Sequence, residues 1–447
     1  MALQTTGPIS LAEIATEFND TAPHSMSEFY SATTGIPTSG TIDVSDFYGA
    51  VNAYPPTVGT LDTTSYGGSG TNAGLYNNFF ALGYDPNTDK FVFTNNDSGT
   101  ASRSRAITIN QNNSITFHTV NTISAIEYRM TDIVYDTGIN KLVSITRNRP
   151  PDNSNSPRAY VRVITVNTDS SLSLGTATDL NGVDVMAYVS MGFDPTVNRS
   201  LAVYTDAISP RELYAHVIQA NSNNAITSHT RYDLGWDSSN VLDCGYNPTY
   251  DRMYIFAWGS GTTYRYRVRA ANLSATTATF GSWVDGALST QFTNLGWTTS
   301  NVTIDPSGST YIFGQTSTSS YDIVYMAVYG TGPTVSAVTT LPSHAVSGWY
   351  ATSPAVTWDN NTGKILVAQV RRAYSPSRWI IEILEYKPNG NTNLTFIRRT
   401  TIASGNFNTR WPQIAAFNAG GGKALCIVKE YNSTAGSLTF AYVPGNE

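Results

Sequence analysis

The sequence predicts a mainly β protein: a seven-bladed β-propeller preceded by a small N-terminal module of short helices. Three observations lead to this prediction. One phrase is repeated seven times along the chain, the last copy lacks its final strand, and an acidic N-terminal segment precedes the repeats.

The repeated phrase is a short apolar run, an Asp or Asn turn, a basic or polar residue and a second apolar run. In the first copy, Phe79–Tyr84 is the apolar run, Asp85–Asp89 is the turn and Lys90–Phe93 leads back. Asp at the start of a turn accepts bonds from backbone amides two residues on, which favours a hairpin. Successive turn anchors lie 51 to 59 residues apart, a period that suits one four-stranded propeller blade. The anchors are Asp85, Asp136, Asp194, Asn247, Asp305, Asp359 and Asn418.

A third strand follows each hairpin as an alternating run of aromatic and β-branched residues, which is typical of half-buried strands. These runs are Arg105–Ile109, Tyr160–Val166, Leu213–Ile218, Tyr264–Arg269, Asp322–Tyr329, Trp379–Tyr386 and Leu438–Val443. The alternative is a β-sandwich with irregular hairpins, but seven regular copies argue against it. The Gly-His and Trp-Asp pairs of the commonest propeller are missing, so the scaffold functions of that family do not transfer.

The seventh repeat stops at its third strand, because the chain ends at Glu447. Residues 57–62, which precede the first hairpin, resemble the fourth-strand stretches 173–176 and 335–338. We therefore expect 57–62 to pair with the last blade, since an unclosed blade would expose a strand edge. This divides the chain into an N-terminal module at 1–52 and a propeller at 53–447.

The composition excludes several classes of partner. The first 50 residues hold six acids and no base, and the remaining 26 acids and 26 bases cancel. The basic excess that drives nucleic-acid binding is absent, so we expect no nucleic-acid partner. No run of about 18 apolar residues exists, so we expect no membrane insertion. Charged residues make up 13% of the chain, about half the usual share, which is typical of proteins that face an extracellular or particle-surface environment.

The sequence offers no catalytic or metal-binding motif. The five histidines are not spaced with another ligand as a metal site requires, so we expect no metal and no cofactor. Nucleophile-elbow, phosphate-loop and calcium-loop motifs are missing, which favours a non-enzymatic protein. Cys244 and Cys426 are interpreted as small buried apolar residues. Several acids lie near strand ends, yet nothing selects a catalytic pair among Asp184, Asp206, Asp233, Asp237 and Asp285.

Two other groups of residues have a structural and a binding interpretation. Arg265, Arg267 and Arg269 alternate along one strand, as a solvated outer face does, with contact to an anionic glycan as the alternative. Three tryptophans lie at similar distances before their anchors, which indicates repeated packing, with stacking on sugar rings as the alternative. These are Trp236, Trp297 and Trp349.

Three short helices are predicted in the N-terminal module. Ser10 with Glu13, Ser25 with Glu28 and Asp43 with Asp46 each place a capping side chain three residues before an acid. Such small helices cannot form a core of their own, so their apolar residues need each other or a partner. One interpretation is a mini-bundle packed against the propeller, and the other is a docking module. The docking residues would be Ile9, Leu11, Ile14, Phe18, Phe29, Tyr30, Phe47 and Tyr48.

The three phrases Pro8–Phe18, Pro23–Tyr30 and Pro37–Gly49 resemble, in this order, the N-terminal segment of tailed-bacteriophage virion proteins, notably tail and fibre-like proteins of marine phages. In that family the segment recurs before different C-terminal domains, which implies an attachment module. The resemblance covers about 50 of the 447 residues. It departs from the family at Ala12-Glu13 and Asp43-Val44, where the usual phrase repeats Ser-Leu-Ser-Asp, which leaves open the partner surface that is recognised.

The resemblance and the repeats together predict a non-enzymatic virion structural protein, tail or fibre-like. Residues 1–52 would dock to other virion proteins, and the propeller would contact the host surface, as a glycan or a protein, or neighbouring subunits. The protein would be made in the host cytoplasm and located in the virion. Three alternatives stay open: a glycan-binding or glycan-cleaving propeller similar to a depolymerase, a capsid decoration protein, and assembly as a homo-oligomer.

Overall fold

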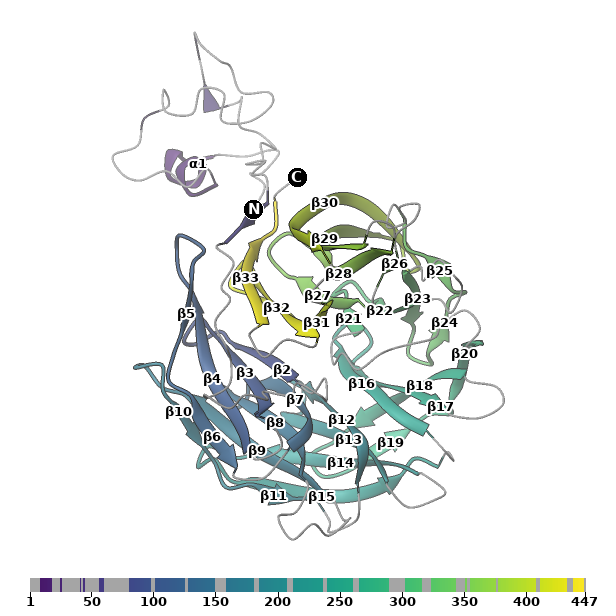
Figure 1. The fold of residues 1–447 in the computed structure, drawn as a ribbon. Helices are drawn as coiled ribbons and strands as arrows, with labels where there is room; N and C mark the ends of the chain where they lie inside the picture. Colours follow the sequence, from purple (N-terminus) through teal and green to yellow (C-terminus); the bar gives the residue numbers. More distant parts are fainter. Residues whose placement is uncertain are drawn as a thin grey trace.

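Seven antiparallel sheets are arranged in a ring in the computed structural model (Figure 1). Each sheet is one blade, and its strands follow one another from the inside of the ring to the outer edge. The described residues are 9–17, 25, 41, 43–44, 56–59, 80–97, 101–124, 128–148, 158–180, 185–206, 212–235, 239–259, 265–288, 302–315, 323–342, 350–351, 354–374, 377–406, 411–431 and 437–445.

The blades take their strands in sequence order. Blade 1 contains β2 (Phe80–Asp85), β3 (Lys90–Asp97), β4 (Ala101–Ile109), β5 (Ile115–Phe117) and β6 (Asn121–Ser124). Blade 2 contains β7 (Tyr128–Asp136), β8 (Lys141–Asn148), β9 (Arg158–Val166), β10 (Leu172–Leu174) and β11 (Thr178–Asp179). Blade 3 contains β12 (Val185–Asp194), β13 (Arg199–Asp206), β14 (Leu213–Ala220) and β15 (Ile226–Asp233).

Blades 4 to 7 follow the same order. Blade 4 contains β16 (Ser239–Asn247), β17 (Arg252–Gly259), β18 (Arg265–Leu273), β19 (Ala278–Phe280) and β20 (Val284–Leu288), and blade 5 contains β21 (Val302–Ile304), β22 (Thr310–Gln315), β23 (Ile323–Tyr329), β24 (Thr334–Val335) and β25 (Thr339–Thr340). Blade 6 contains β26 (Tyr350–Ala351), β27 (Ala355–Asp359), β28 (Lys364–Tyr374), β29 (Ser377–Asn389) and β30 (Asn393–Asn406). Blade 7 contains β31 (Trp411–Gly420), β32 (Lys423–Tyr431), β33 (Ser437–Val443) and β1 (Thr57–Val58). The predicted seven-bladed propeller is confirmed, and the predicted third strands fall on β4, β9, β14, β18, β23, β29 and β33.

The outer position of blade 7 is filled by a strand from the other end of the chain. Thr57–Val58 pair with Tyr442–Val443 of β33, and the amide of Gly59 donates to the carbonyl of Ala441 over 2.9 Å. Strands β1 and β33 lie side by side in Figure 1. Residues 60–62, which were expected to pair here as well, lie outside the described residues.

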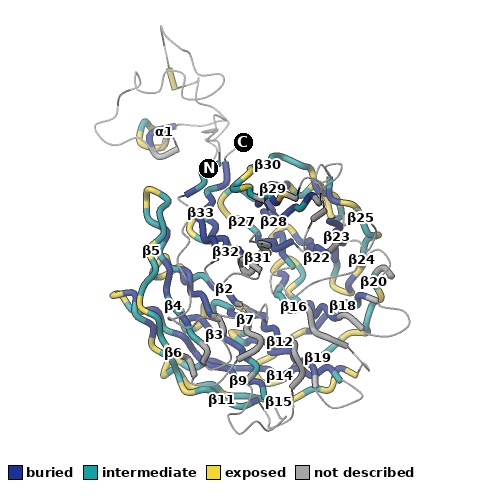
Figure 2. The backbone as a smooth tube through the Cα atoms, viewed as in Figure 1, coloured by how far each residue is buried: buried dark blue, intermediate teal, exposed yellow. Residues whose placement is uncertain are grey.

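The hydrophobic core is divided among the contacts between blades. In the described part of the chain, seven clusters of buried apolar residues each join two neighbouring blades. At the contact of blades 6 and 7, for example, Leu366 and Ile383 pack with Phe417 and Phe440. The middle strands are therefore buried on both faces, whereas the outer strands contain a mixture of half-buried and exposed residues (Figure 2). The ring is stabilised by seven layers of packing between sheets rather than by one central core.

The predicted Asp and Asn anchors begin tight turns in six blades. Oδ1 of Asp85, which is buried, accepts from the amide of Asn87 over 3.0 Å, as an Asx turn requires. The last residue of this turn, Asp89, has a φ of 52°. Asn140, Asn198 and Asp251 occupy the same place in their blades with φ of 50° to 54°, a left-handed conformation that Asn and Asp tolerate.

The seventh anchor was predicted wrongly. Asn418 lies inside β31, and its side chain donates to the carbonyl of Leu82 in blade 1 over 2.8 Å. The turn comes later, where Gly420 pairs with Lys423 across Gly421 and Gly422. Both of these glycines have positive φ, of 58° and 74°, so they form the two-residue turn that non-glycine residues adopt at a cost.

A side chain near the start of the second strand ties most blades to the next one. Lys423 of blade 7, for example, donates to the carbonyl of Asn110 in blade 1 over 2.8 Å. The equivalent bonds run from Lys141 to Ser222, Arg199 to Ala275, Tyr254 to Gly330, Tyr311 to Gly390 and Lys364 to Gly445. The basic residue in the repeated phrase therefore has a structural role in several blades: it satisfies a backbone carbonyl of the neighbouring blade.

The predicted module of three N-terminal helices is not supported, because one short helix is described before the propeller. This helix, α1, spans Leu11–Glu17. The segments that were expected to become helical after Ser25 and Asp43 lie almost entirely outside the described residues.

Candidate functional site

The predicted docking residues fall mostly outside the described part of the chain. Phe18, Phe29, Tyr30, Phe47 and Tyr48 are among the residues that the structure does not describe. The other three lie on or next to α1.

Of these three, Ile14 has an exposed fraction of 0% and Ile9 of 9%, while Leu11 is half-buried. Ile14 is therefore already covered within this chain. Leu11 is the more accessible of the predicted docking residues on α1.

The N-terminus of α1 forms the predicted capping box. The amide of Glu13 donates to Oγ of Ser10 over 3.2 Å, and the amide and hydroxyl of Ser10 donate to Oε2 of Glu13 over 2.6 and 2.7 Å. The hydrogen bond from the Ser10 amide, followed by that from the Ser10 hydroxyl, lowers the pKa of the Glu13 carboxyl. The reciprocal arrangement satisfies amides that have no partner inside the helix. The capping logic that the sequence suggested for this helix is confirmed.

Two of the arginines predicted on one face of β18 are engaged by groups of blade 4 and of the neighbouring blade 3. Nε of Arg267 lies 2.5 Å from Oδ1 of Asp285. Arg269 donates to the carbonyls of Gly281 and Leu234 over 2.7 and 2.8 Å, and partial burial lowers its pKa. Its guanidinium also lies over the ring of Trp283, 5.6 Å from the centroid. These contacts hold Arg267 against the outer strand of blade 4 and Arg269 between blades 3 and 4. The side chain of Arg265 is not described.

The acids considered for catalysis hold local structure where they are described. Asp233 accepts from the amide of Gly235 over 2.7 Å, and Asp285 pairs with Arg267. The side chains of Asp184, Asp206 and Asp237, and the tryptophans Trp236, Trp297 and Trp349, are outside the described residues.

Two described histidines are held as neutral hydrogen-bonding groups. The ring nitrogens of His216 lie 3.0 Å from the hydroxyls of Ser228 and Tyr204, and burial lowers the pKa of His216 to about 4. His118 lies 2.8 Å from Oγ1 of Thr108, and burial lowers its pKa as well. No group of three or more His, Cys, Asp or Glu side chains that could bind a metal exists among the described residues. Cys244 and Cys426 are buried thiols, as expected.

The most unusual polar group links the innermost strands of three blades, and sequence reasoning missed it. Oγ of Ser190 on β12 lies 2.8 Å from Oδ2 of Asp132 on β7 and 3.3 Å from Oδ1 of Asp243 on β16. The amide of Met191 also donates to Oδ2 of Asp132 over 2.9 Å. We call Asp132, Ser190 and Asp243 the acid pair with its bridging serine.

Both carboxyl groups of the acid pair resist ionisation. Burial is the largest cause that raises the pKa of Asp132, and burial followed by the charge of Asp132 raises the pKa of Asp243 well above its usual value. Hydrogen bonds from Ser190 and from backbone amides act in the opposite direction in both cases. The pair lies at the contacts of blades 2, 3 and 4.

A signal for this group was present in the repeats. Each of the three residues lies four positions before its turn anchor, where blades 1 and 6 have Ala81 and Ala355. Alignment of the anchors therefore shows a column that is polar in blades 2 to 5, where blade 5 has Asn301, and small and apolar in blades 1 and 6. Periodicity along one strand cannot show this, because the three residues are 53 and 58 positions apart.

Blade 6 contains a buried polar cluster of the opposite kind. Nε and Nη2 of Arg371 each lie 2.5 Å from an oxygen of Glu382, and Nε2 of Gln369 donates to Oε2 of the same carboxylate over 3.0 Å. All three side chains are buried. Here the acid has a bidentate basic partner, which is the usual way to bury a carboxylate.

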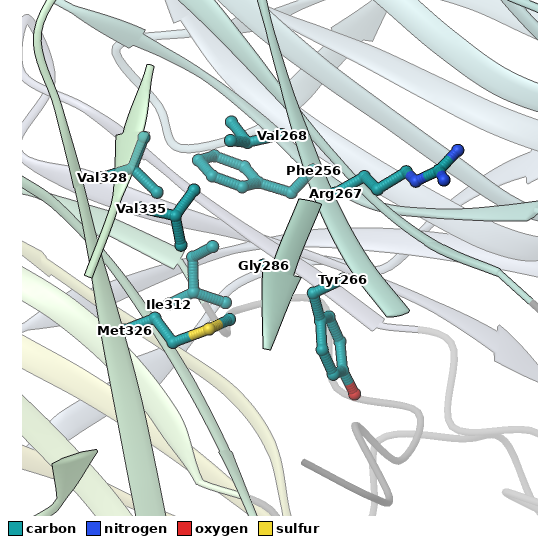
Figure 3. A pocket seen from close by; sticks show the side chains of 9 residues that line it. All are labelled: Phe256, Tyr266, Arg267, Val268, Gly286, Ile312, Met326, Val328 and Val335. Atoms are coloured by element: carbon teal, nitrogen blue, oxygen red, sulfur yellow. The ribbon is translucent and has the colours of Figure 1, made fainter. Parts of the chain in front are cut away.

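A small cavity of about 10 Å³ lies between blades 4 and 5 (Figure 3). It is lined by Phe256, Tyr266, Arg267, Val268, Gly286, Ile312, Met326, Val328 and Val335. Mostly apolar side chains point into it, and its volume is at the size of a single water molecule. This cavity is a packing defect between two blades and is too small for a substrate.

No described helix is long and apolar enough to cross a membrane. No family model and no curated protein matches this sequence.

Among solved structures, the chain is similar to a protein described as a candidate 6-phosphogluconolactonase of Bacteroides uniformis, with a TM-score of 0.46 and 13% identity over 73% of this chain and 87% of that one. It is also similar to Trypanosoma rangeli sialidase in complex with the inhibitor DANA, with a TM-score of 0.42 and 11% identity over 72% of this chain and 56% of the sialidase. A third likeness is to the Dos1 propeller, with a TM-score of 0.42 and 12% identity over 82% of this chain and 92% of that one. Likenesses this distant say nothing about what this chain binds or does.

Proposed function

We propose that this chain is a structural protein of a tailed-bacteriophage particle, tail or fibre-like, with no enzymatic activity of its own. It docks to other virion proteins through residues 1–52 and displays the propeller to the host surface or to neighbouring subunits. In this proposal the protein is made in the host cytoplasm and is located in the virion.

The observation that carries the proposal is the way in which the ring closes. With Thr57–Val58 in place beside β33, each of the seven sheets has an outer strand, and residues 1–52 contribute to none of these sheets in the described part of the chain. A segment that the propeller does not use for its sheets is free to serve attachment. Its three phrases are those that resemble the attachment segment of phage tail and fibre-like proteins.

The chemistry of the segment supports a protein partner. Among the described residues, the one large apolar side chain classed as exposed is Val44, at 37%. The first 50 residues carry six acids and no base, so a groove with a comparatively basic rim would complement them. The capping bonds between Ser10 and Glu13 stabilise the first turn of α1, the helix that would bind in such a groove.

Deletion of residues 1–52 tests the docking role. The truncated protein should keep a folded propeller, because the closing strand starts at Thr57. It should be lost from particles that assemble in its presence, as measured by mass spectrometry against an unchanged virion protein. Full-length Gly332→Ala is the matched control, since a Cβ at that position meets nothing within 4 Å and incorporation should be normal. Normal incorporation of the folded, truncated protein would contradict the proposal.

The absence of hydrolase activity is tested separately. Purified full-length protein incubated with host polysaccharide should release no reducing ends. Release that single Asp→Asn changes abolish would replace the structural role of the propeller with an enzymatic one.

A further inference from the structure

The acid pair with its bridging serine cannot be satisfied with both carboxyl groups ionised. Ser190 has one hydroxyl hydrogen, yet its Oγ is within hydrogen-bond distance of Asp132 and of Asp243. When the hydroxyl donates to Asp132 over the shorter distance of 2.8 Å, it presents a lone pair to Oδ1 of Asp243. A proton on Asp243 turns this contact between two acceptors into a hydrogen bond.

In the part of the chain that the structure describes, no lysine or arginine side chain neutralises the pair. Among the described residues, neither Asp132 nor Asp243 forms an ion pair with a lysine or arginine. The groups that face them are the Ser190 hydroxyl and the amides of Ile133, Met191, Cys244 and Val302, from β7, β12, β16 and β21.

Another titratable group near the pair is the buried thiol of Cys244, whose pKa is raised by burial and by the charges of both acids. Asp132 and Asp243 are half-buried, and two like charges that share one hydroxyl group oppose each other's ionisation. A proton on one of them removes the repulsion.

We propose that Asp132 and Asp243 share one proton at neutral pH, held mainly on Asp243, and that this proton acts as a pH-sensitive latch between blades 2, 3 and 4. In this chain of hydrogen bonds, the protonated Asp243 donates to Oγ of Ser190, and the Ser190 hydroxyl donates to Asp132. Loss of the proton leaves two carboxylates on one hydroxyl and weakens the contact between the inner strands.

The sign of the pH effect follows from linkage. The folded state raises the pKa of both carboxyl groups, so it binds protons more tightly than the unfolded chain does. The stabilisation is fully present below the unfolded Asp value of about 4 and is lost as pH rises through the folded value. The latch therefore favours the closed ring in acid and loosens it in alkali.

The test compares the thermal midpoint of full-length wild type and of Asp243→Asn from pH 4 to pH 9. An Asn at 243 carries no charge at any pH, and its amide can donate to Ser190; the Cys244 amide, which donates to the same Oδ1 in the wild type, then loses its acceptor, at a cost that does not change with pH. The difference in midpoint, variant minus wild type, should be near zero or negative at pH 4 and should rise steadily with pH. A difference that stays constant across the range would overturn the latch.

The matched control is Asp169→Asn, in the exposed turn where blades 1 and 3 have Asn112 and Asn223. Hydrogen bonds from Ser171 lower the pKa of Asp169, so its stabilisation is present above the unfolded Asp value of about 4, and removal of this acid should give a negative difference that stays nearly constant from pH 5 to pH 9. A rise with pH in this control as well would mean that the gain at Asp243 reflects net charge, and the proposal would fail.

Infrared spectroscopy of the wild type gives a second readout that does not depend on the stability of a variant. The carbonyl band of a protonated carboxylic acid should be present at neutral pH and missing in Asp243→Asn. Its absence from the folded wild type would contradict the shared proton. A rise in the wild-type midpoint with added calcium or magnesium chloride, absent in Asp243→Asn, would also contradict it, because the pair would then hold a cation in place of a proton.

Discussion

The propeller and the segment that precedes it satisfy their side chains in different ways. In the propeller, each blade packs both of its faces on its neighbours, and basic residues at the strand starts bond the adjoining blade. The preceding segment supplies one described helix of seven residues, six acids without a base, and the exposed Val44. The comparison teaches that the ring completes its own contacts, whereas the first fifty residues have chemistry suited to another surface.

The contacts between blades also differ among themselves. Blades 6 and 7 bury an acid with a base: Nζ of Lys364 lies 2.7 Å from Oε2 of Glu385, and Tyr442 donates to the same carboxylate over 2.5 Å. Blades 2 and 4 instead direct two acids at one serine. Similar strand geometry therefore gives contacts with different responses to mutation and to pH, and the predictions below use this difference.

The largest effect is expected from Lys364→Met in the ring. The change leaves Glu385, with an exposed fraction of 0%, without its base, and it also removes the bond from Lys364 to the carbonyl of Gly445. Removal of one partner of a buried pair costs about 3 to 5 kcal/mol in free energy of unfolding. Denaturant unfolding measures it. Arg158→Met at the pair with Asp179, where the arginine side chain is 42% exposed, should cost ~1 kcal/mol or less, and equal losses at the two sites would remove the distinction.

The next effect concerns a group that the propeller buries neutral. The folded state lowers the pKa of His216 from 6.5 to about 4, so this histidine adds stability above pH 6.5 that is lost as pH falls toward 4. The shift corresponds to roughly 3 kcal/mol at most. His216→Gln should flatten the acid limb of the stability profile, and His118→Gln, at a more open position, should flatten it less. An unchanged acid limb in His216→Gln would show that His216 titrates normally.

A smaller effect is expected at Gly59, which follows the closing strand β1 and lies against blade 1. A Cβ at Gly59 would lie 2.0 Å from the carbonyl oxygen of Asn113, so Gly59→Ala should displace the strand at a cost of about 1 to 3 kcal/mol. The same geometry recurs at Gly175, where a Cβ would lie 2.5 Å from the carbonyl oxygen of Asn224. Thermal unfolding compares these variants with Gly332→Ala, and equal midpoints for Gly59→Ala and Gly332→Ala would argue that β1 does not close the ring.

The smallest effect lies in the N-terminal segment. Ser10→Ala removes the cap of α1 and should speed amide hydrogen exchange in Leu11–Glu17 by about fivefold. The thermal midpoint of the propeller should stay the same, since the sheets do not include this helix. A lower propeller midpoint would show that α1 is part of the ring, contrary to the separation drawn above.

The sequence was sufficient for the fold because its decisive signals are local. Asp85 and the equivalent anchors bond amides two residues away, so each turn is visible in a few letters. It failed at Asn418, because Gly421 and Gly422 make a shorter turn that moves the hairpin two residues on.

The acid pair joins strands of different blades that are far apart in the sequence, and no pattern along one strand marks it. Lys364 and Glu385 lie on the adjacent strands β28 and β29, but the pairing of their side chains depends on the strand register. The burial of Ile14 was also out of reach, since amphipathic spacing cannot distinguish a side chain covered by its own chain from one covered by a partner.

The central claim is that residues 1–52 are an attachment module, and the most direct measurement is a transfer of function. Residues 1–52 are fused to an unrelated soluble reporter, and its copy number in purified particles is measured by quantitative mass spectrometry. The account predicts incorporation of the fusion and not of the reporter alone, with Phe18→Ala or Phe47→Ala weakening docking by roughly 1 to 4 kcal/mol. A fusion that is folded and soluble but absent from the particles would contradict the claim.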